Sequence, residues 1–141
     1  MKILLDTCIL GELRRPQTSD SIQAALAPFD DEDLFLSVLT IGEITKGIVL
    51  LSESRKKHEL TKWLNGLEHQ FSDRILSLNH EIALMWGELT GRAEADGIII
   101  PVSDGLIAAT ALYHGLHIMT RNLRHFKATG AFLIDPGNFS N

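Results

Sequence analysis

Short apolar runs alternate along this chain with longer segments in which apolar residues recur every three or four positions. The short runs are apolar at consecutive positions, which is typical of strands covered by helices on both faces of a sheet. They predict five strands, at residues 3–5, 34–36, 75–76 with Leu78, 118–119 and 132–134.

The longer segments have the helical period and carry recognisable start and stop signals. They predict helices at residues 6–15, 21–27, 38–51, 54–71, 79–94 and 102–115. Ser37, Ser54 and Asn79 are suited to cap helix N-termini, because a short polar side chain accepts a hydrogen bond from a free backbone N–H. Prolines end the first two helices and glycines end the last two, at Pro16, Pro28, Gly97 and Gly115.

Alternation of strands and helices predicts an α/β fold. We expect a three-layer α/β/α sandwich around a mostly parallel sheet. In such folds ligands bind beyond the carboxyl ends of the strands, where helices begin. Polar residues directly after a predicted strand are therefore the first candidates for a functional site.

Composition narrows the class of protein. The 141 residues suit one domain, and 45% hydrophobic residues exclude disorder over most of the length. One cysteine permits no internal disulfide, which suits a reducing cytosol. No apolar run approaches the roughly 18 residues that span a bilayer, and Asp6 interrupts the first run too early for a signal peptide. We therefore expect a cytoplasmic protein.

The net charge of −5 argues against a protein that grips nucleic acid by bulk electrostatics. It allows an enzyme that gathers carboxylates around metal ions and contacts its substrate through local basic groups. Candidate basic groups near the acidic residues are Arg14, Arg15 and Arg121, which we expect to hold an RNA backbone if RNA is the substrate.

Asp6 and Glu43 are the first two acidic candidates. Asp6 follows the first predicted strand directly, where it serves either as a helix N-cap or as a site residue. Glu43 lies on a predicted helix that is apolar nearly all round, so we expect a buried helix and a carboxylate that is paired or metal-bound. Its alternative partner is Lys46, three residues further along the helix.

Asp104 and Asn122 complete the set. Asp104 falls in the first turn of a predicted helix, on the same face as the apolar residues Ile107 and Ala108. Asn122 follows the fourth predicted strand, as Asp6 follows the first, although an ordinary turn residue has the same signature.

Three carboxylates in one dry pocket raise each other's pKa, and a divalent cation relieves their repulsion. Oxygen ligands alone favour Mg²⁺ or Mn²⁺ over zinc. Such a site polarises a phosphate and activates water near neutral pH. The chemistry that fits best is phosphodiester hydrolysis.

Four segments in order along the chain resemble those of PIN-domain ribonucleases, and more closely the VapC/FitB-type toxins of type II toxin–antitoxin pairs. They are ILLDT at 3–7, LTIGEITKG at 39–47, SDGLIAATA at 103–111 and TRN at 120–122. The resemblance runs from residue 1 to about residue 135. It implies a three-layer α/β sandwich, in agreement with the reading from periodicity.

The resemblance also implies roles for individual residues. Asp6, Glu43 and Asp104 would bind metal, and Asn122 would join them as a catalytic residue where many members carry a fourth acid. Thr7 and Thr120 would orient carboxylates or water from behind the metal ligands.

The activity implied is a Mg²⁺-dependent endoribonuclease toxin, with Mn²⁺ as a possible substitute, that hydrolyses RNA with metal-activated water. Implied partners are a small antitoxin, operator DNA through that antitoxin, and a second copy in a homodimer. Ala108, Ala109 and Ala111 are small enough for close helix packing in such a dimer. An alternative of another class is a catalytically weak binding module that pairs with an antitoxin to regulate operator DNA.

Overall fold

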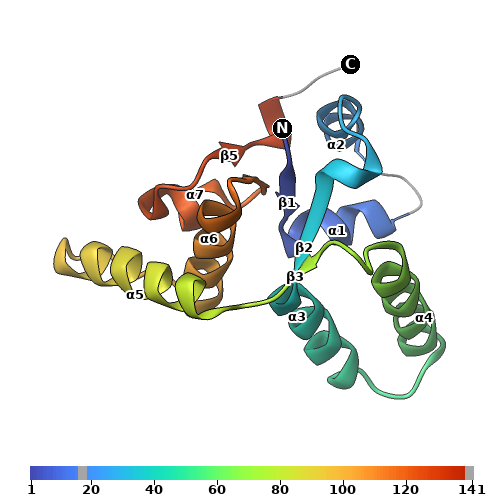
Figure 1. The fold of residues 1–141 in the computed structure, drawn as a ribbon. Coiled ribbons are helices and arrows are strands. Elements are labelled where there is room, and N and C mark those ends of the chain that lie inside the picture. Colours follow the sequence, from blue (N-terminus) through green and yellow to red (C-terminus); the bar gives the residue numbers. More distant parts are fainter. Residues whose placement is uncertain (16–18, 139–141) are drawn as a thin grey trace.

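The computed structural model describes residues 1–15 and 19–138 and contains a five-stranded parallel sheet. The strand order is β3-β2-β1-β4-β5, so the chain starts in the middle of the sheet and builds outwards on both sides (Figure 1). The strands are β1 (Ile3–Leu5), β2 (Leu34–Ser37), β3 (Ile75–Leu76), β4 (His117–Met119) and β5 (Leu133–Ile134). The predicted α/β architecture is confirmed.

The central strand β1 is buried from end to end because helices cover both faces of the sheet. Its alternate side chains enter two different hydrophobic cores. Ile3 and Leu5 belong to one core, whereas Leu4 belongs to the other. Register pairs Ile3 with Leu34 on one side and Leu5 with Met119 on the other. A shift by one residue would exchange the two cores, so the end of β1 is firmly placed.

Two helical layers flank the strands. Figure 1 shows α1 (Thr7–Arg14) and α2 (Asp20–Leu26) on one side, and α6 (Val102–His114) and α7 (Leu123–Phe126) on the other. The first layer also receives Leu67 and Phe71 from the end of α4 (Arg55–Gln70). The second layer is built around Ile107, Ala108 and Phe126.

Helix α3 (Val38–Val49) corrects one expectation from the sequence. Its apolar pattern predicts a buried helix, yet only Thr40 and Ile48 are buried. Figure 1 shows α3 and α4 projecting together from the sheet, so α4 covers one side of α3 and much of the rest faces solvent. Val49 at its end is 67% exposed.

Local signals in the sequence place most helix ends correctly. Ser37, Ser54 and Asn79 each cap a helix by accepting a hydrogen bond from a backbone N–H, and Gly115 ends α6 with a φ of 68°. Three 3₁₀ turns and the short helix α7 were not predicted, because none is long enough to show a period; the turns are Asp31–Asp33, Lys127–Thr129 and Pro136–Asn138. Pro16, the predicted stop of the first helix, lies outside the described residues.

Within residues 1–15 and 19–138, no helix combines the length and the apolar character needed to cross a bilayer. Helix α5 (His80–Ala95) runs outwards from the body and packs mainly on α6 (Figure 1).

The contact between α5 and α6 depends on a glycine next to a candidate site residue. A Cβ atom at Gly105 would lie 2.9 Å from Trp86 Cδ1 and 2.9 Å from Thr90 Cγ2. Gly105 therefore lets α6 approach α5 closely at the turn that carries Asp104. Trp86 packs against this turn, and Trp63 packs against the first core.

We expect Gly105→Ala to lower the free energy of unfolding by about 1–3 kcal/mol, because the added methyl group overlaps the Trp86 and Thr90 side chains, which must shift to make room. Urea denaturation followed by circular dichroism measures the loss. Gly91→Ala is the matched control, because it lies in α5 with nothing within 4 Å of the added methyl group. This control should gain up to about 1 kcal/mol from helix propensity. Equal stability of Gly105→Ala and the wild type would contradict the close-packing argument.

Candidate functional site

Asp6 stands at the carboxyl end of β1 and is 6% exposed. Its Oδ1 accepts a hydrogen bond from the Thr7 backbone N–H at 2.9 Å, which caps α1. Its Oδ2 accepts a hydrogen bond from Thr120 Oγ1 at 2.8 Å. The two roles that the sequence left open for Asp6 are therefore compatible, because the cap uses one oxygen and leaves lone pairs on both.

The turn after β4 is tied directly to Asp6. The Asp6 backbone N–H donates to the Met119 carbonyl at 3.1 Å, and Thr120 is fully buried. The Asn122 backbone N–H donates to Thr120 Oγ1 at 2.9 Å, so one hydroxyl joins Asp6 to the start of α7. Asn122 is exposed beside this junction, at the strand end where the sequence placed it.

Glu43 reaches the same edge of the sheet from α3. Its Oε1 accepts a hydrogen bond from Thr7 Oγ1 at 3.2 Å, and Thr7 Oγ1 also lies 3.4 Å from Thr40 Oγ1. In the part of the chain that the structure describes, no ion pair joins Glu43 to Lys46. The carboxylate is thus directed at the first turn of α1, next to Asp6.

Asp104 enters from α6 with a side chain that is 17% exposed. Its Oδ2 lies 3.3 Å from Nδ1 of His125 on α7. Sequence reasoning did not single out His125, because α7 is too short to show which residues share its inner face. The sequence signal that could have indicated His125 is its position three residues after Asn122, which places the two residues about one helical turn apart on the same face.

The three carboxylates are coupled electrostatically. Burial raises the pKa of Glu43, and the charges of Asp6 and Asp104 raise it further, against the Thr7 hydrogen bond. Burial also raises the pKa of Asp104, as does the charge of Asp6, while His125 lowers it. Asp6 therefore destabilises the ionised forms of two carboxylates that come from distant segments, Glu43 and Asp104.

These residues fit a hard divalent cation by their chemistry. All three candidates are carboxylates, and the repulsion among them is relieved by positive charge. No group of three or more His, Cys, Asp or Glu side chains within residues 1–15 and 19–138 already stands in the arrangement of a metal site. Glu43 contacts Thr7 and Asp104 contacts His125, so holding an ion requires the three carboxylates to come closer together.

Arg121 is engaged in a structural ion pair. Its Nε and Nη2 donate to the two carboxylate oxygens of Glu12 at 2.7 and 3.0 Å, and this hydrogen bonding lowers the pKa of Glu12. Nη2 also donates to Ser19 and Ser21 hydroxyls at 3.0 and 3.1 Å. Arg121 thus fastens the turn after β4 to α1 and α2. Any contact of this guanidinium with RNA would have to compete with its pairing to Glu12.

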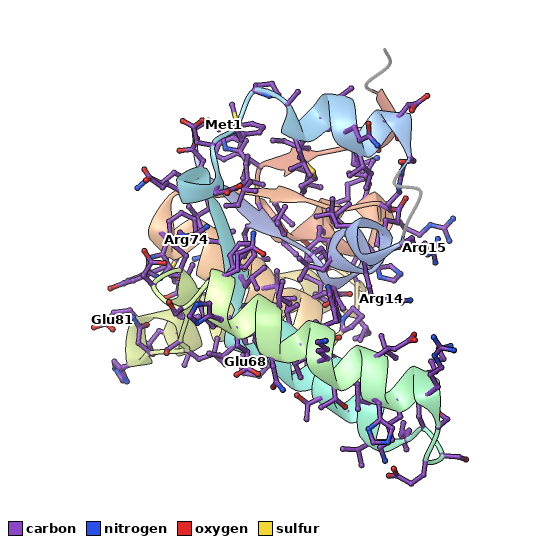
Figure 2. All side chains as sticks on the ribbon, turned by 90° about the vertical axis from the view of Figure 1, so that its right-hand side faces the viewer. Met1, Arg14, Arg15, Glu68, Arg74 and Glu81 are labelled. Atoms are coloured by element: carbon purple, nitrogen blue, oxygen red, sulfur yellow. The ribbon has the colours of Figure 1, made fainter. Side chains whose placement is uncertain are left out.

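Arg14 and Arg15 lie at the opposite end of α1 from Asp6, about 12 Å along the helix. Figure 2 shows the two residues together at the end of this helix. They are exposed and do not adjoin the carboxylates.

Cys8 lies between Asp6 and Thr120, with Sγ 3.6 Å from Asp6 Oδ2 and 3.8 Å from Thr120 Oγ1. Burial raises the pKa of its thiol, and so does the charge of Asp6. A neutral thiol in this place fills space beside Asp6 and is a poor nucleophile.

The PIN domain family model matches residues 3–131 of this chain. The chain belongs to the PIN-domain family. The toxin FitB of Neisseria gonorrhoeae is 34% identical to this PIN-domain protein over 135 residues, which cover 95% of this chain and 97% of FitB. The VapC ribonuclease Y4jK of Sinorhizobium fredii is 29% identical over 138 residues, 95% of this chain and 96% of the relative.

A solved structure gives the same relationship in three dimensions. The structure of FitAB bound to the IR36 DNA fragment contains a chain that superposes with a TM-score of 0.89 at 31% identity. The match covers 99% of this PIN-domain protein and 98% of that chain. The family resemblance found in four short segments is therefore confirmed over nearly the whole chain.

Glu43→Gln should stabilise the metal-free PIN-domain protein near pH 8. The folded pKa of Glu43 is raised above its unfolded value of about 4.3, so the wild type loses stability as pH rises through that window. The amide removes the charge while Oε1 still accepts the Thr7 hydrogen bond. We expect a Tm gain of a few degrees near pH 8 that shrinks as the pH approaches 4.3.

Thermal unfolding in metal-free buffer at a series of pH values measures this difference. Glu68→Gln on α4 is the control, because its exposed carboxylate removes the same charge far from Asp6 and Asp104. A lower Tm for Glu43→Gln at high pH would contradict the electrostatic strain.

Proposed function

We propose that this PIN-domain protein is a Mg²⁺-dependent endoribonuclease toxin that acts in the cytoplasm. The observation that supports this proposal best is the electrostatic coupling of Asp6, Glu43 and Asp104, which lie at the carboxyl edge of a parallel sheet. Relatives named as ribonucleases and as a toxin support the choice of reaction and of biological role.

In the proposed mechanism, Asp6, Glu43 and Asp104 hold a divalent cation, with Mn²⁺ as a substitute for Mg²⁺. When bound, such a cation polarises a phosphate and lowers the pKa of water. Thr120 and Thr7 keep Asp6 and Glu43 in place through neutral hydroxyls, which leave the negative charge intact. Asn122 lies beside them and is available to orient water or a phosphate oxygen through its amide.

His125 assists by holding Asp104. The Nδ1 atom of His125 lies 3.3 Å from the Asp104 carboxylate, and the His125 side chain is 51% exposed. The imidazole limits the rotation of Asp104 at the first turn of α6.

Asp6→Asn should reduce RNA cleavage roughly a hundredfold or more, because it removes the charge that is most deeply buried in the site. The fold should persist, since the amide oxygen can still cap α1 and Thr120 can turn its hydroxyl to accept from the amide nitrogen. Cleavage of a labelled RNA with Mg²⁺ measures activity, and circular dichroism measures the fold. Asp20→Asn at the exposed start of α2 is the matched control and should cleave like the wild type.

Two results would contradict the nuclease proposal: cleavage that continues in excess chelator, and undiminished cleavage by Asp6→Asn. A wild-type protein that binds its partner but cleaves no RNA with Mg²⁺ or Mn²⁺ would favour the alternative, a binding module.

We infer that the partner is a small antitoxin, with operator DNA bound through it. The toxin FitB is found in a structure of FitAB bound to a DNA fragment, and this chain superposes on it closely. An apolar surface hollow of about 360 Å³ between α1, α2 and α4 is a suitable seat for an apolar segment of such a partner. Leu10, Leu13, Phe29, Trp63 and Leu67 are among its lining residues.

We also propose a homodimer, which the family resemblance implies. Ala108, Ala109 and Ala111 do not form its surface, because all three are fully buried inside the protomer against the sheet and neighbouring helices. Ile99 and Val102 are 72% and 62% exposed and line one hollow on α5, where burial against a second copy would be favourable.

Sedimentation of the free protein should give a dimer at micromolar concentration, and Ile99→Glu should shift it towards monomer because a charge would enter the apolar contact. Phe132→Glu is the control, since Phe132 is also exposed, at 67%, but lies before β5. A wild-type monomer at this concentration would rule out the dimer.

A further inference from the structure

Two cations on and after α7 lie beside the carboxylate site without acidic partners. Arg124 and Lys127 are exposed and three residues apart. Among the described residues, neither has a carboxylate within ion-pair distance, whereas Arg121 is held by Glu12. In a chain of net charge −5, two unpaired cations next to each other on and after α7 form a local positive surface that suits an anionic ligand.

The surface around these cations is hollowed in two adjoining places. Arg121, Asn122, Leu123, Arg124 and His125 line a hollow of about 270 Å³. A second hollow, of about 520 Å³, is lined by Leu123, Arg124, Lys127 and Leu133. Leu123 and Arg124 line both, so the two hollows adjoin at these residues, and we refer to the pair of hollows as the track.

Two residues that line the first hollow also contact the surroundings of the carboxylates. His125, which lines the first hollow, stands 3.3 Å from Asp104 Oδ2. Asn122 lines the same hollow, and its backbone is hydrogen-bonded to the hydroxyl that holds Asp6. A strand with a phosphate at the carboxylates can therefore place its following phosphates on the track.

We propose that Arg124 and Lys127 form a subsite for the sugar–phosphate backbone of the RNA strand, leading away from the scissile phosphate. This inference rests on the proposed nuclease function and refines it. Two cations three residues apart suit a ligand that carries one negative charge per repeating unit, as a nucleic-acid backbone does. Contacts with phosphates fix the position of a strand without reading its sequence. Arg121 has a structural role beside this subsite. Its guanidinium is paired with Glu12, so we do not count its charge among those that bind phosphate.

The test compares Arg124→Gln/Lys127→Gln with Arg55→Gln/Lys56→Gln, which removes the same two charges at the exposed start of α4. Both pairs are placed in an Asp6→Asn background to prevent cleavage. Fluorescence anisotropy measures the Kd for a labelled unstructured RNA of about 20 nucleotides in Mg²⁺, over salt concentrations of about 50 to 200 mM. Single-stranded DNA of the same sequence shows whether the ribose contributes.

We expect Arg124→Gln/Lys127→Gln to raise the Kd for RNA roughly tenfold and to reduce the slope of log Kd against log salt by about 1.4, since each contact with a single strand contributes about 0.7. The control pair should stay within about twofold, because its charges are screened from the bound strand. In the cleaving protein the same double substitution should raise KM and leave kcat nearly unchanged.

An unchanged Kd and an unchanged salt slope, in a protein whose wild type cleaves this RNA, would overturn the subsite while the nuclease function stands. The same result together with weaker capture of an acidic protein partner would assign the track to that partner instead. A wild type that neither binds nor cleaves RNA would overturn the nuclease function and the subsite with it.

Discussion

The mutual repulsion of three carboxylates at one edge of a parallel sheet is the constraint on which the site depends. Strand β1 is buried on both faces, so Asp6 cannot withdraw from the edge. Glu43 and Asp104 come from α3 and α6, and burial together with neighbouring charge raises the pKa of each. The free protein therefore carries an electrostatic strain, and in the proposed nuclease this strain would be relieved by a divalent cation and would contribute to metal affinity.

The side chains that hydrogen-bond Asp6 and Glu43 are uncharged, so they leave the repulsion among the carboxylates in place. Thr120 and Thr7 are neutral donors, and each ties a carboxylate to an element far away in sequence; Thr120 lies 114 positions from Asp6. A guanidinium in the same place would neutralise the site and compete with the metal. The strong cation nearby, Arg121, is instead paired with Glu12 at the perimeter, where it anchors the turn that carries Thr120. The threonines thus fix the positions of the site carboxylates, while the carboxylates alone supply the charge of the site.

Features that depend on local pattern could be predicted from the sequence. The strands, the caps at Ser37 and Asn79, and the position of Asp6 at the end of the first strand follow from neighbours in the chain. Features that depend on what covers a surface could not. The apolar pattern of α3 does not reveal that much of this helix stays exposed, and nothing in TRN distinguishes an Arg121 paired with Glu12 from one that is free. His125 was missed for the same reason, since its partner Asp104 is distant in sequence.

The placement of paired and unpaired cations explains how an acidic protein can act on RNA. At physiological salt, charges more than about 8–10 Å away are largely screened, so the total of −5 matters less than the groups in contact with the strand. In the proposed nuclease, the carboxylates would repel a phosphate until a cation is bound, whereas Arg124 and Lys127 would attract the neighbouring phosphates with or without metal. Under the proposed function, RNA binding along α7 and metal binding at Asp6 would therefore support each other: the strand would bring phosphate oxygens to the cation, and the cation would remove the repulsion that expels the strand.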